Sequence, residues 1–481
     1  MKRITTLLTA GLFALTAACG GGDKPSPKTG ANGKTGTGGE GAPALSKDAQ
    51  AKFNAALDLF IEHDKKNDWT ADSCADVAKK FDEVGKNAQA LFNSGLSYQR
   101  CNDDKNAKAK FEAALQADPK FHHARAQLAL YQYKADGNED AAISALQQAV
   151  TDAQFQNVPA LVNLAMVQMA RDSAQGGQGC KDDMDCAKLN LQRALAIDDA
   201  YMPAFNQLAL YYFQLAKKRA GAVKGTSKSS KGRQIITHAS QQKKADVQQL
   251  ELAALVCSQA IRKNPSYAPI HNTAGLIQNE LGQVNGAVAA FATAAKLDPK
   301  LFEAQMNYAA VNLGFRGFEQ AQQAYKKALE MRPNDYDAHL GMALAIRGPI
   351  TGAEPNYDQL VAAAQAELDA AKKIDPNRPD AYYNEGILTQ EFKAKAGGAK
   401  EKTIAELESA KKIFQTFLEK AAGKPEYDGA IKRVKGDGSK KDLGRLGDID
   451  DTIAFLQLDA NAQKDATNQS SADAASEGEK K

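Results

Sequence analysis

One spacing of residues recurs along most of this chain and limits what it can fold into. In residues 88–121 the spacing consists of Leu91, Gly95, Tyr98, Ala107, Phe111, Ala114 and Pro119. The small residues allow two antiparallel helices to approach closely, and the bulky residues fill the space between them. The proline stops the second helix. The spacing therefore predicts a helical hairpin.

The same register returns without gaps in two units that lie 34 residues apart. The first contains His271, Gly275, Ala287, Phe291, Ala294 and Pro299, and the second contains Tyr308, Ala309, Ala321, Tyr325, Ala328 and Pro333. Degenerate or lengthened copies occupy residues 122–157, 158–201, 202–267, 336–378 and 379–427. With a capping hairpin at 45–87, we expect about nine hairpins. Some of them have expanded loops between their helices.

The composition agrees with an all-α body. Hydrophobic residues make up 43% of the chain, there are only 15 prolines, and apolar runs with period two are almost absent. The 61 basic residues are balanced by 58 acidic residues. A protein dedicated to nucleic acid would concentrate positive charge over one face, so we expect no nucleic-acid partner.

Over residues 88–427 this spacing resembles that of tetratricopeptide-repeat (TPR) proteins. The resemblance implies a right-handed superhelical solenoid whose concave face is lined by the first helix of each hairpin and binds extended peptides. An amide can grip a peptide backbone with a donor and an acceptor. The alternative is that asparagine is only a common surface residue of the family. Asparagine stands at the sixth position of four first helices: Asn93, Asn163, Asn307 and Asn384.

The neighbours of these asparagines are Phe92, Val162, Met306 and Tyr383. Family members that bind the carboxylate of a peptide tail have lysine or arginine at such places. The groove is therefore predicted to be too apolar for that class of partner.

The N-terminus predicts the compartment. Lys2 and Arg3 precede an apolar stretch, 4–18, that is too short to span a bilayer. The stretch ends at Cys19 and resembles a lipobox, although Thr16 departs from the usual leucine. We expect a signal peptide at 1–18 and a lipid anchor on Cys19. The alternative is an ordinary secretory signal with an incidental cysteine. Since no aspartate follows Cys19, the sorting rule of enteric bacteria implies the outer membrane, with the body in the periplasm.

Polar segments flank the repeats. Residues 19–44 comprise Cys19 and a stretch rich in Gly, Lys, Pro, Ser and Thr, which predicts a flexible tether. Residues 428–461 are expected to form a linker and a C-terminal capping helix, and residues 462–481 a disordered tail.

A basic insertion at 217–244 interrupts one hairpin and contains no acidic residue. It is either a solvated loop or a contact with an anionic lipid, peptidoglycan or an acidic partner. Its basic residues are Lys217, Lys218, Arg219, Lys224, Lys228, Lys231, Arg233, Lys243 and Lys244.

The cysteines are consistent with an oxidising periplasm. Cys180 and Cys186 bracket a short polar loop and are predicted to form a disulfide. Cys74 and Cys101 lie near helix ends that are adjacent in antiparallel stacking, so we predict a second disulfide. Cys257 is predicted to be a buried thiol.

Catalytic and cofactor motifs are absent from the sequence. It has no HExxH zinc motif, no GxSxG nucleophile elbow, no phosphate-binding loop and no dinucleotide-binding fingerprint. His271 and His339 fall where a packed core ring is expected. We therefore expect a protein that is not an enzyme, with no metal, no cofactor and no small-molecule substrate.

A lipid-anchored repeat array predicts a scaffold for other proteins of the cell envelope. Its layout resembles the TPR lipoproteins of the adventurous gliding-motility machinery of myxobacteria, which implies a part of such a machine. The alternative is an adaptor. It would act as a pilotin in secretin or pilus assembly, or as a docking platform for peptidoglycan hydrolases.

Overall fold

A computed structural model describes residues 45–66, 68–177, 179–222, 246–394, 399–439 and 442–458. The predicted signal peptide, Cys19, the tether and the tail lie outside these residues. So do Lys224, Lys228, Lys231, Arg233, Lys243 and Lys244 of the basic insertion.

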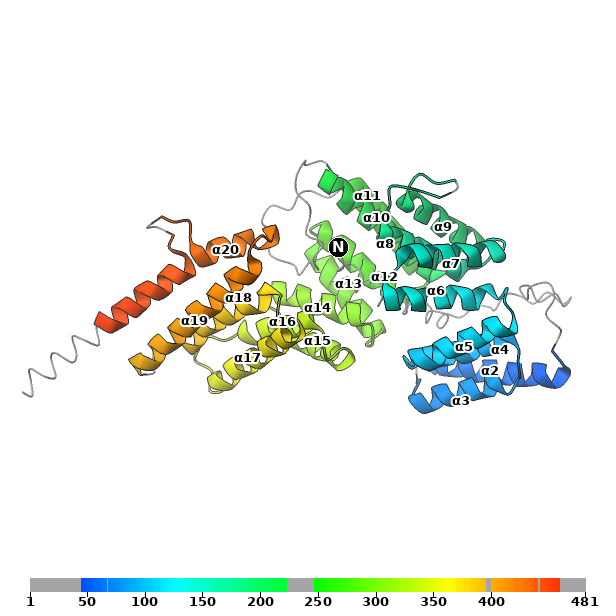
Figure 1. Cartoon of the computed structure of the whole chain (residues 1–481), viewed down its shortest axis with the longest axis horizontal. Coiled ribbons are helices and arrows are strands. Elements are labelled where there is room, and N and C mark those ends of the chain that lie inside the picture. The colour runs from blue at the N-terminus through cyan, green and yellow to red at the C-terminus, as the bar shows by residue number, and fades with distance from the viewer. Residues whose placement is uncertain are drawn as a thin grey trace, which may run out of the picture. The chain divides into compact units, whose positions relative to one another are not determined.

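The chain divides into two compact units, the first ending at Leu297 and the second beginning at Asp298. The helices of unit 1 (Figure 1) are α2 (Lys47–Lys66), α3 (Ala71–Asp82), α4 (Ala88–Arg100), α5 (Asp104–Ala117), α6 (His122–Asp136), α7 (Glu139–Asp152), α8 (Val158–Arg171), α9 (Asp183–Ile197), α10 (Met202–Ala222), α11 (Val247–Lys263), α12 (Ala268–Glu280) and α13 (Val284–Leu297).

Unit 2 continues with α14 (Phe302–Gly314), α15 (Phe318–Met331), α16 (Tyr336–Arg347), α17 (Tyr357–Ile374), α18 (Pro379–Leu388), the π-helix η2 (Thr389–Lys393), α19 (Lys400–Ala421), the 3₁₀ turn η3 (Pro425–Tyr427) and α20 (Asp428–Lys435). Residues 444–458 form a last helix. Within the described residues, α2 to α19 make nine consecutive hairpins. The prediction of an all-α array of TPR-like hairpins is confirmed.

The second helices from α5 to α17 each bury one motif: alanine, a large or apolar residue four positions later, and alanine three positions after that. Examples are Ala107, Phe111 and Ala114 in α5, Ala187, Leu191 and Ala194 in α9, Ala253, Cys257 and Ala260 in α11, and Ala364, Leu368 and Ala371 in α17. The alanines permit close contact with the first helix, and the middle residue fills the remaining space.

In the three hairpins whose middle residue is phenylalanine, glycine stands opposite the ring on the first helix: Gly95, Gly275 and Gly386. A Cβ atom on Gly95 would lie 2.6 Å from the ring of Phe111, and one on Gly386 would lie 2.5 Å from the ring of Phe414. These distances are shorter than any van der Waals contact allows. The two glycines are therefore required by the approach of the ring and not by backbone conformation.

The turns between hairpins share a hydrogen bond that the sequence analysis did not foresee. Five first helices place a donor side chain against the carbonyl of the preceding proline. The pairs are Arg125 to Pro119, His271 to Pro265, Gln305 to Pro299, His339 to Pro333 and Tyr382 to Pro376. The expectation of packed core rings for His271 and His339 is therefore wrong. Both are only half-buried, and their Nε2 atoms lie 2.8 Å from the carbonyl oxygens that the turn leaves free.

The N-terminal hairpin is fastened to the second hairpin by two consecutive residues. Arg100 donates to both carboxylate oxygens of Asp64 at 2.7 and 2.8 Å, with both side chains largely buried. Its neighbour Cys101 is joined to Cys74 of α3 by a disulfide. This hairpin therefore caps unit 1 through a covalent bond and a shielded ion pair.

None of the helices in the described residues is both long enough and apolar enough to span a membrane.

Candidate protein-binding surface

The first helices share one register when each is counted from its N-cap residue. From the second hairpin to the ninth, the eighth residue after the N-cap is small and buried: Gly95, Ala129, Ala165, Ala209, Gly275, Ala309, Ala343 and Gly386. Successive first helices contact one another within unit 1 (α6, α8, α10 and α12) and within unit 2 (α14, α16 and α18). The residues around this position therefore form a continuous strip in each unit.

The four predicted asparagines all stand at the sixth residue after the N-cap. Asn93, Asn307 and Asn384 are half-buried, whereas Asn163 is only 3% exposed. The side-chain amide of Asn384 donates to the carbonyl of Asp380 at 2.9 Å, and Gln89 lies 3.4 Å from the oxygen of Asn93. Their role in binding a partner stays a prediction. Three of them are accessible for it, and Asn163 is not.

Three further polar side chains occupy the same position and were missed by a search for asparagine. Gln127, Gln207 and Thr273 stand six residues after their N-caps in α6, α10 and α12, and all three are buried. The hydroxyl of Thr273 donates to Asn206 at 2.6 Å, and Gln99 donates to Gln127 at 3.3 Å. All three stand two positions before the small residue of their helix, and this spacing would have identified them.

In unit 1 these polar groups bond mainly within the protein. Helix α8 is the extreme case, because only Pro159, Ala170 and Arg171 of its residues are not buried. Val162, next to Asn163, is 1% exposed. A partner could reach this part of the strip only if neighbouring helices moved.

Unit 2 presents a more polar strip. Tyr383 and Asn384 of α18 are half-buried, and Arg347 of α16 donates to the backbone carbonyl of Asn384 at 3.1 Å. Burial lowers the pKa of Arg347, against the raising effect of Glu391. Arg347 stands twelve residues after its N-cap. The basic residues expected from the family pattern stand at earlier positions of the first helix, so the pattern does not indicate Arg347.

The start of the predicted basic insertion is helical. Helix α10 runs to Ala222 and includes Lys217, Lys218 and Arg219. The ammonium of Lys217 lies 5.0 Å from the centre of the Phe213 ring, and burial lowers the pKa of Lys217. Lys218 pairs with Asp172 at 2.6 Å. These two lysines are bound to the body of unit 1 and are not displayed on a free loop.

The cysteines lie as follows. Disulfides join Cys74 to Cys101 and Cys180 to Cys186, with Cα–Cα distances of 6.4 and 5.1 Å. The thiol of Cys257 is free and 2% exposed, and burial raises its pKa to about 12. A buried thiol that stays protonated is unreactive at neutral pH, so Cys257 serves as a small core residue.

No cluster of three or more histidine, cysteine, aspartate or glutamate side chains could hold a metal ion in the part of the chain that the structure describes. The features with a regular arrangement are the strips of the first helices, and their polar groups are suited to hydrogen bonding.

Comparison with known proteins supports the repeat. A tetratricopeptide repeat model matches residues 88–121, which form α4 and α5. No curated protein matches the chain.

Solved structures resemble parts of the fold. A thermophilic TPR protein of Thermus thermophilus is 25% identical, with a TM-score of 0.36 over 47% of this chain and 98% of that one. PilF of Pseudomonas aeruginosa is 15% identical, with a TM-score of 0.38 over 56% and 98%. PilW, described as a type IV pilus biogenesis factor, is 15% identical, with a TM-score of 0.36 over 54% and 98%. TM-scores this low support no inference about partners. The chain contains a tetratricopeptide repeat within an all-α array of similar hairpins.

Proposed function

We propose that this protein is a membrane-anchored scaffold that binds other proteins in a complex of the cell envelope. The observation on which the proposal mainly rests is the repeated register of the first helices, which aligns polar side chains on successive hairpins. In repeat proteins each repeat contacts only its neighbours, and the extended surface that results is used for binding. Unit 2 is the favoured binding unit because both of its asparagines, Asn307 and Asn384, are partly accessible, whereas Asn163 of unit 1 is buried.

The location is part of the proposal. The lipobox-like sequence ending at Cys19 supports a lipid anchor, and two disulfides support an oxidising compartment outside the cytoplasm. We propose the outer membrane as the site of anchoring and the periplasm as the location of the body. A gliding-motility machine is the first candidate complex, and an adaptor for secretins, pili or peptidoglycan hydrolases is the second.

Affinity purification of the crosslinked protein from envelope membranes tests the proposal. Motility subunits should co-purify under the first alternative, and a secretin or hydrolases under the second. Asn307→Ala with Asn384→Ala should weaken recovery of the partner, because each substitution removes a donor and an acceptor from the strip. Asn54→Ala on the exposed side of α2 is the matched control. If no envelope protein co-purifies with the wild-type chain, the scaffold proposal fails.

A Cys19→Ser variant tests the anchor separately. The variant should lose its acyl chains and appear in the soluble periplasmic fraction, whereas the wild type should stay with membranes. Membrane retention of the variant would contradict lipidation at Cys19.

A further inference from the structure

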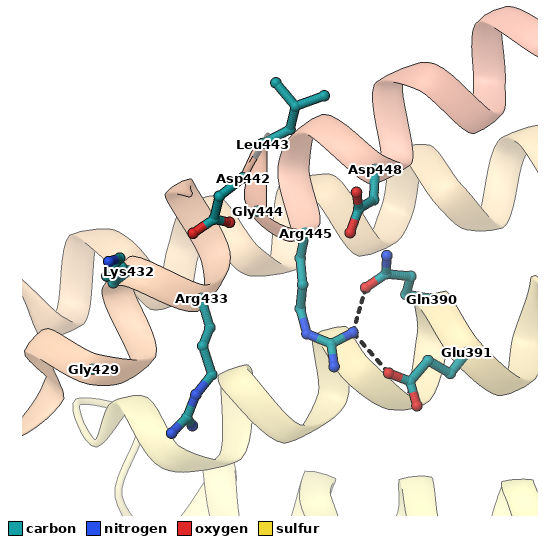
Figure 2. A pocket seen from close by; sticks show the side chains of 10 residues that line it. All are labelled: Gln390, Glu391, Gly429, Lys432, Arg433, Asp442, Leu443, Gly444, Arg445 and Asp448. Atoms are coloured by element: carbon teal, nitrogen blue, oxygen red, sulfur yellow. Dashed lines mark hydrogen bonds and ion pairs between the residues drawn. The ribbon is translucent and has the colours of Figure 1, made fainter. Parts of the chain in front are cut away.

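The C-terminal part of unit 2 contains a pocket that does not belong to the strip of the first helices. Its volume is about 760 Å³, and it lies between η2, α20 and the start of the helix 444–458 (Figure 2). The lining residues are Gln390, Glu391, Gly429, Lys432, Arg433, Asp442, Leu443, Gly444, Arg445 and Asp448. Ten lining residues include only one large apolar side chain, so the pocket is suited to a polar ligand.

The π-helix η2 forms one wall. A π-turn widens a helix by one residue and is often found at functional sites. Gln390 and Glu391 of η2 hold the guanidinium of Arg445, each at 2.8 Å. The same guanidinium lies 5.9 Å from the centre of the Phe414 ring. Arg445 is thus held in one orientation while a quarter of its side chain stays exposed.

Three other charged side chains of the pocket form no ion pair within the residues that the structure describes. Arg433 is exposed and has no carboxylate partner among the described residues. The carboxylates of Asp442 and Asp448 likewise form no ion pair in that part of the chain. In the view of Figure 2, Arg433 and Arg445 point to the same side, and Arg445 lies between Arg433 and Asp448.

The balance of charge indicates the ligand. Among the lining residues that the structure describes, three are basic (Lys432, Arg433 and Arg445) and three are acidic (Glu391, Asp442 and Asp448). A simple anion, an anionic lipid surface or a nucleic acid would meet as many carboxylates as cations and gain little. A peptide with an acidic side chain near a basic one can satisfy both sets. Its carboxylate would take two parallel hydrogen bonds from Arg433, and its cation would pair with Asp448.

We propose that this pocket binds a mixed-charge segment of a protein partner. The inference rests on the proposed function, since it assumes that the chain binds proteins. It adds a second contact site, separate from the strip of the first helices. Glu391 keeps Arg445 partly neutralised, so that Arg433 provides the main attraction for an incoming carboxylate.

Three blocked, fluorescein-labelled octapeptides test the proposal: alternating Glu-Lys, all Glu and all Lys. Fluorescence anisotropy with the full chain should show that the alternating peptide binds tightest. Arg433→Ala and Asp448→Asn should each weaken its binding about tenfold, the value expected for one charge-assisted hydrogen-bonded pair. Lys435→Ala is the matched control, because Lys435 is exposed on α20 but does not line the pocket. Glu391→Gln should shift the preference toward the all-Glu peptide.

Equal binding of the three peptides, or an equal loss with Lys435→Ala, would overturn the pocket proposal. The co-purification experiment separates this failure from that of the scaffold. If Arg433→Ala recovers the same envelope partners as the wild type in the same amounts, the pocket has no role but the scaffold stands. If the wild type recovers none, the scaffold itself fails.

Discussion

Helix α8 in unit 1 and helix α18 in unit 2 are both first helices of a hairpin, and they differ in how much of their surface is covered. Helix α8 has no charged residue before Arg171 and is buried on all sides. Helix α18 contains Asp380 and Glu385, leaves Tyr383 and Asn384 partly accessible, and continues into a π-helix. A helix that is apolar all round belongs to an interior, whereas one with a polar face can meet a partner. The comparison shows that equivalent helices of the array differ in burial and in polarity.

The largest expected effect on stability comes from a cavity in the core around α8. Leu161 is fully buried in the core of unit 1. Leu161→Ala should lower the free energy of unfolding by about 2–5 kcal/mol, because the enclosed site cannot collapse around the lost atoms. Tyr383→Ala at the half-buried surface of α18 is the control and should cost less. Urea denaturation of both variants measures the difference, and equal losses would contradict it.

Reduction of the disulfides should destabilise unit 1 and leave the stability of unit 2 unchanged. All six cysteines precede Asp298, so unit 2 contains none. The disulfide between Cys74 and Cys101 closes a loop with a sequence separation of 27. Dithiothreitol reduces both disulfides of unit 1, and opening the larger loop alone should destabilise this unit by about 3 kcal/mol, because the unfolded chain gains entropy. Hydrogen exchange should quicken in α3 and α4 and stay unchanged in α16 and α17. Equal acceleration in both units would show that their stabilities are coupled.

A smaller effect is expected from filling the space between Gly386 of α18 and the Phe414 ring of α19. Gly386→Ala would place a Cβ atom 2.5 Å from Phe414 and should cost about 1–3 kcal/mol through overpacking. Phe414→Leu in the same chain should restore part of the loss. Gly429→Ala is the control, since nothing lies within 4 Å of its Cβ position. Thermal denaturation compares the three variants, and a neutral Gly386→Ala would show that Phe414 can move aside.

The smallest effect is a pH dependence in unit 1. The His123 ring lies 5.7 Å from Phe92 and 4.3 Å from His122, and burial lowers the pKa of His123 to about 4. An unfolded histidine titrates near pH 6.5. Stability should be complete above that pH and fall between pH 6.5 and 4, because the unfolded chain takes up the proton first. Since the ring is only half-buried, solvent screening reduces the loss to about 1–2 kcal/mol.

Denaturation at a series of pH values measures this dependence. His123→Gln removes the ring that titrates and should flatten the curve between pH 6.5 and 4. An unchanged slope in the variant would assign the dependence to other groups.

The candidate surface was only partly predictable. Asparagine at the sixth position identified Asn307 and Asn384, because a repeated spacing fixes which side chains share a face. The same spacing could not show that Asn163 is buried and the other asparagines are not. The burial of Asn163 depends on α6 and α10, which contact α8 from neighbouring hairpins. The Arg433 pocket was not predictable for the same reason, because it forms where η2, α20 and the helix 444–458 meet.

The sequence alone determined the repeated helical hairpins. The spacing of alanine, aromatic residue and proline acts within one repeat, where two helices meet at a fixed offset. Only the tertiary structure decided which first helix is enclosed, where histidine bonds a turn carbonyl, and which charges stay unpaired. These properties depend on contacts between hairpins, and such contacts follow from the way successive repeats stack.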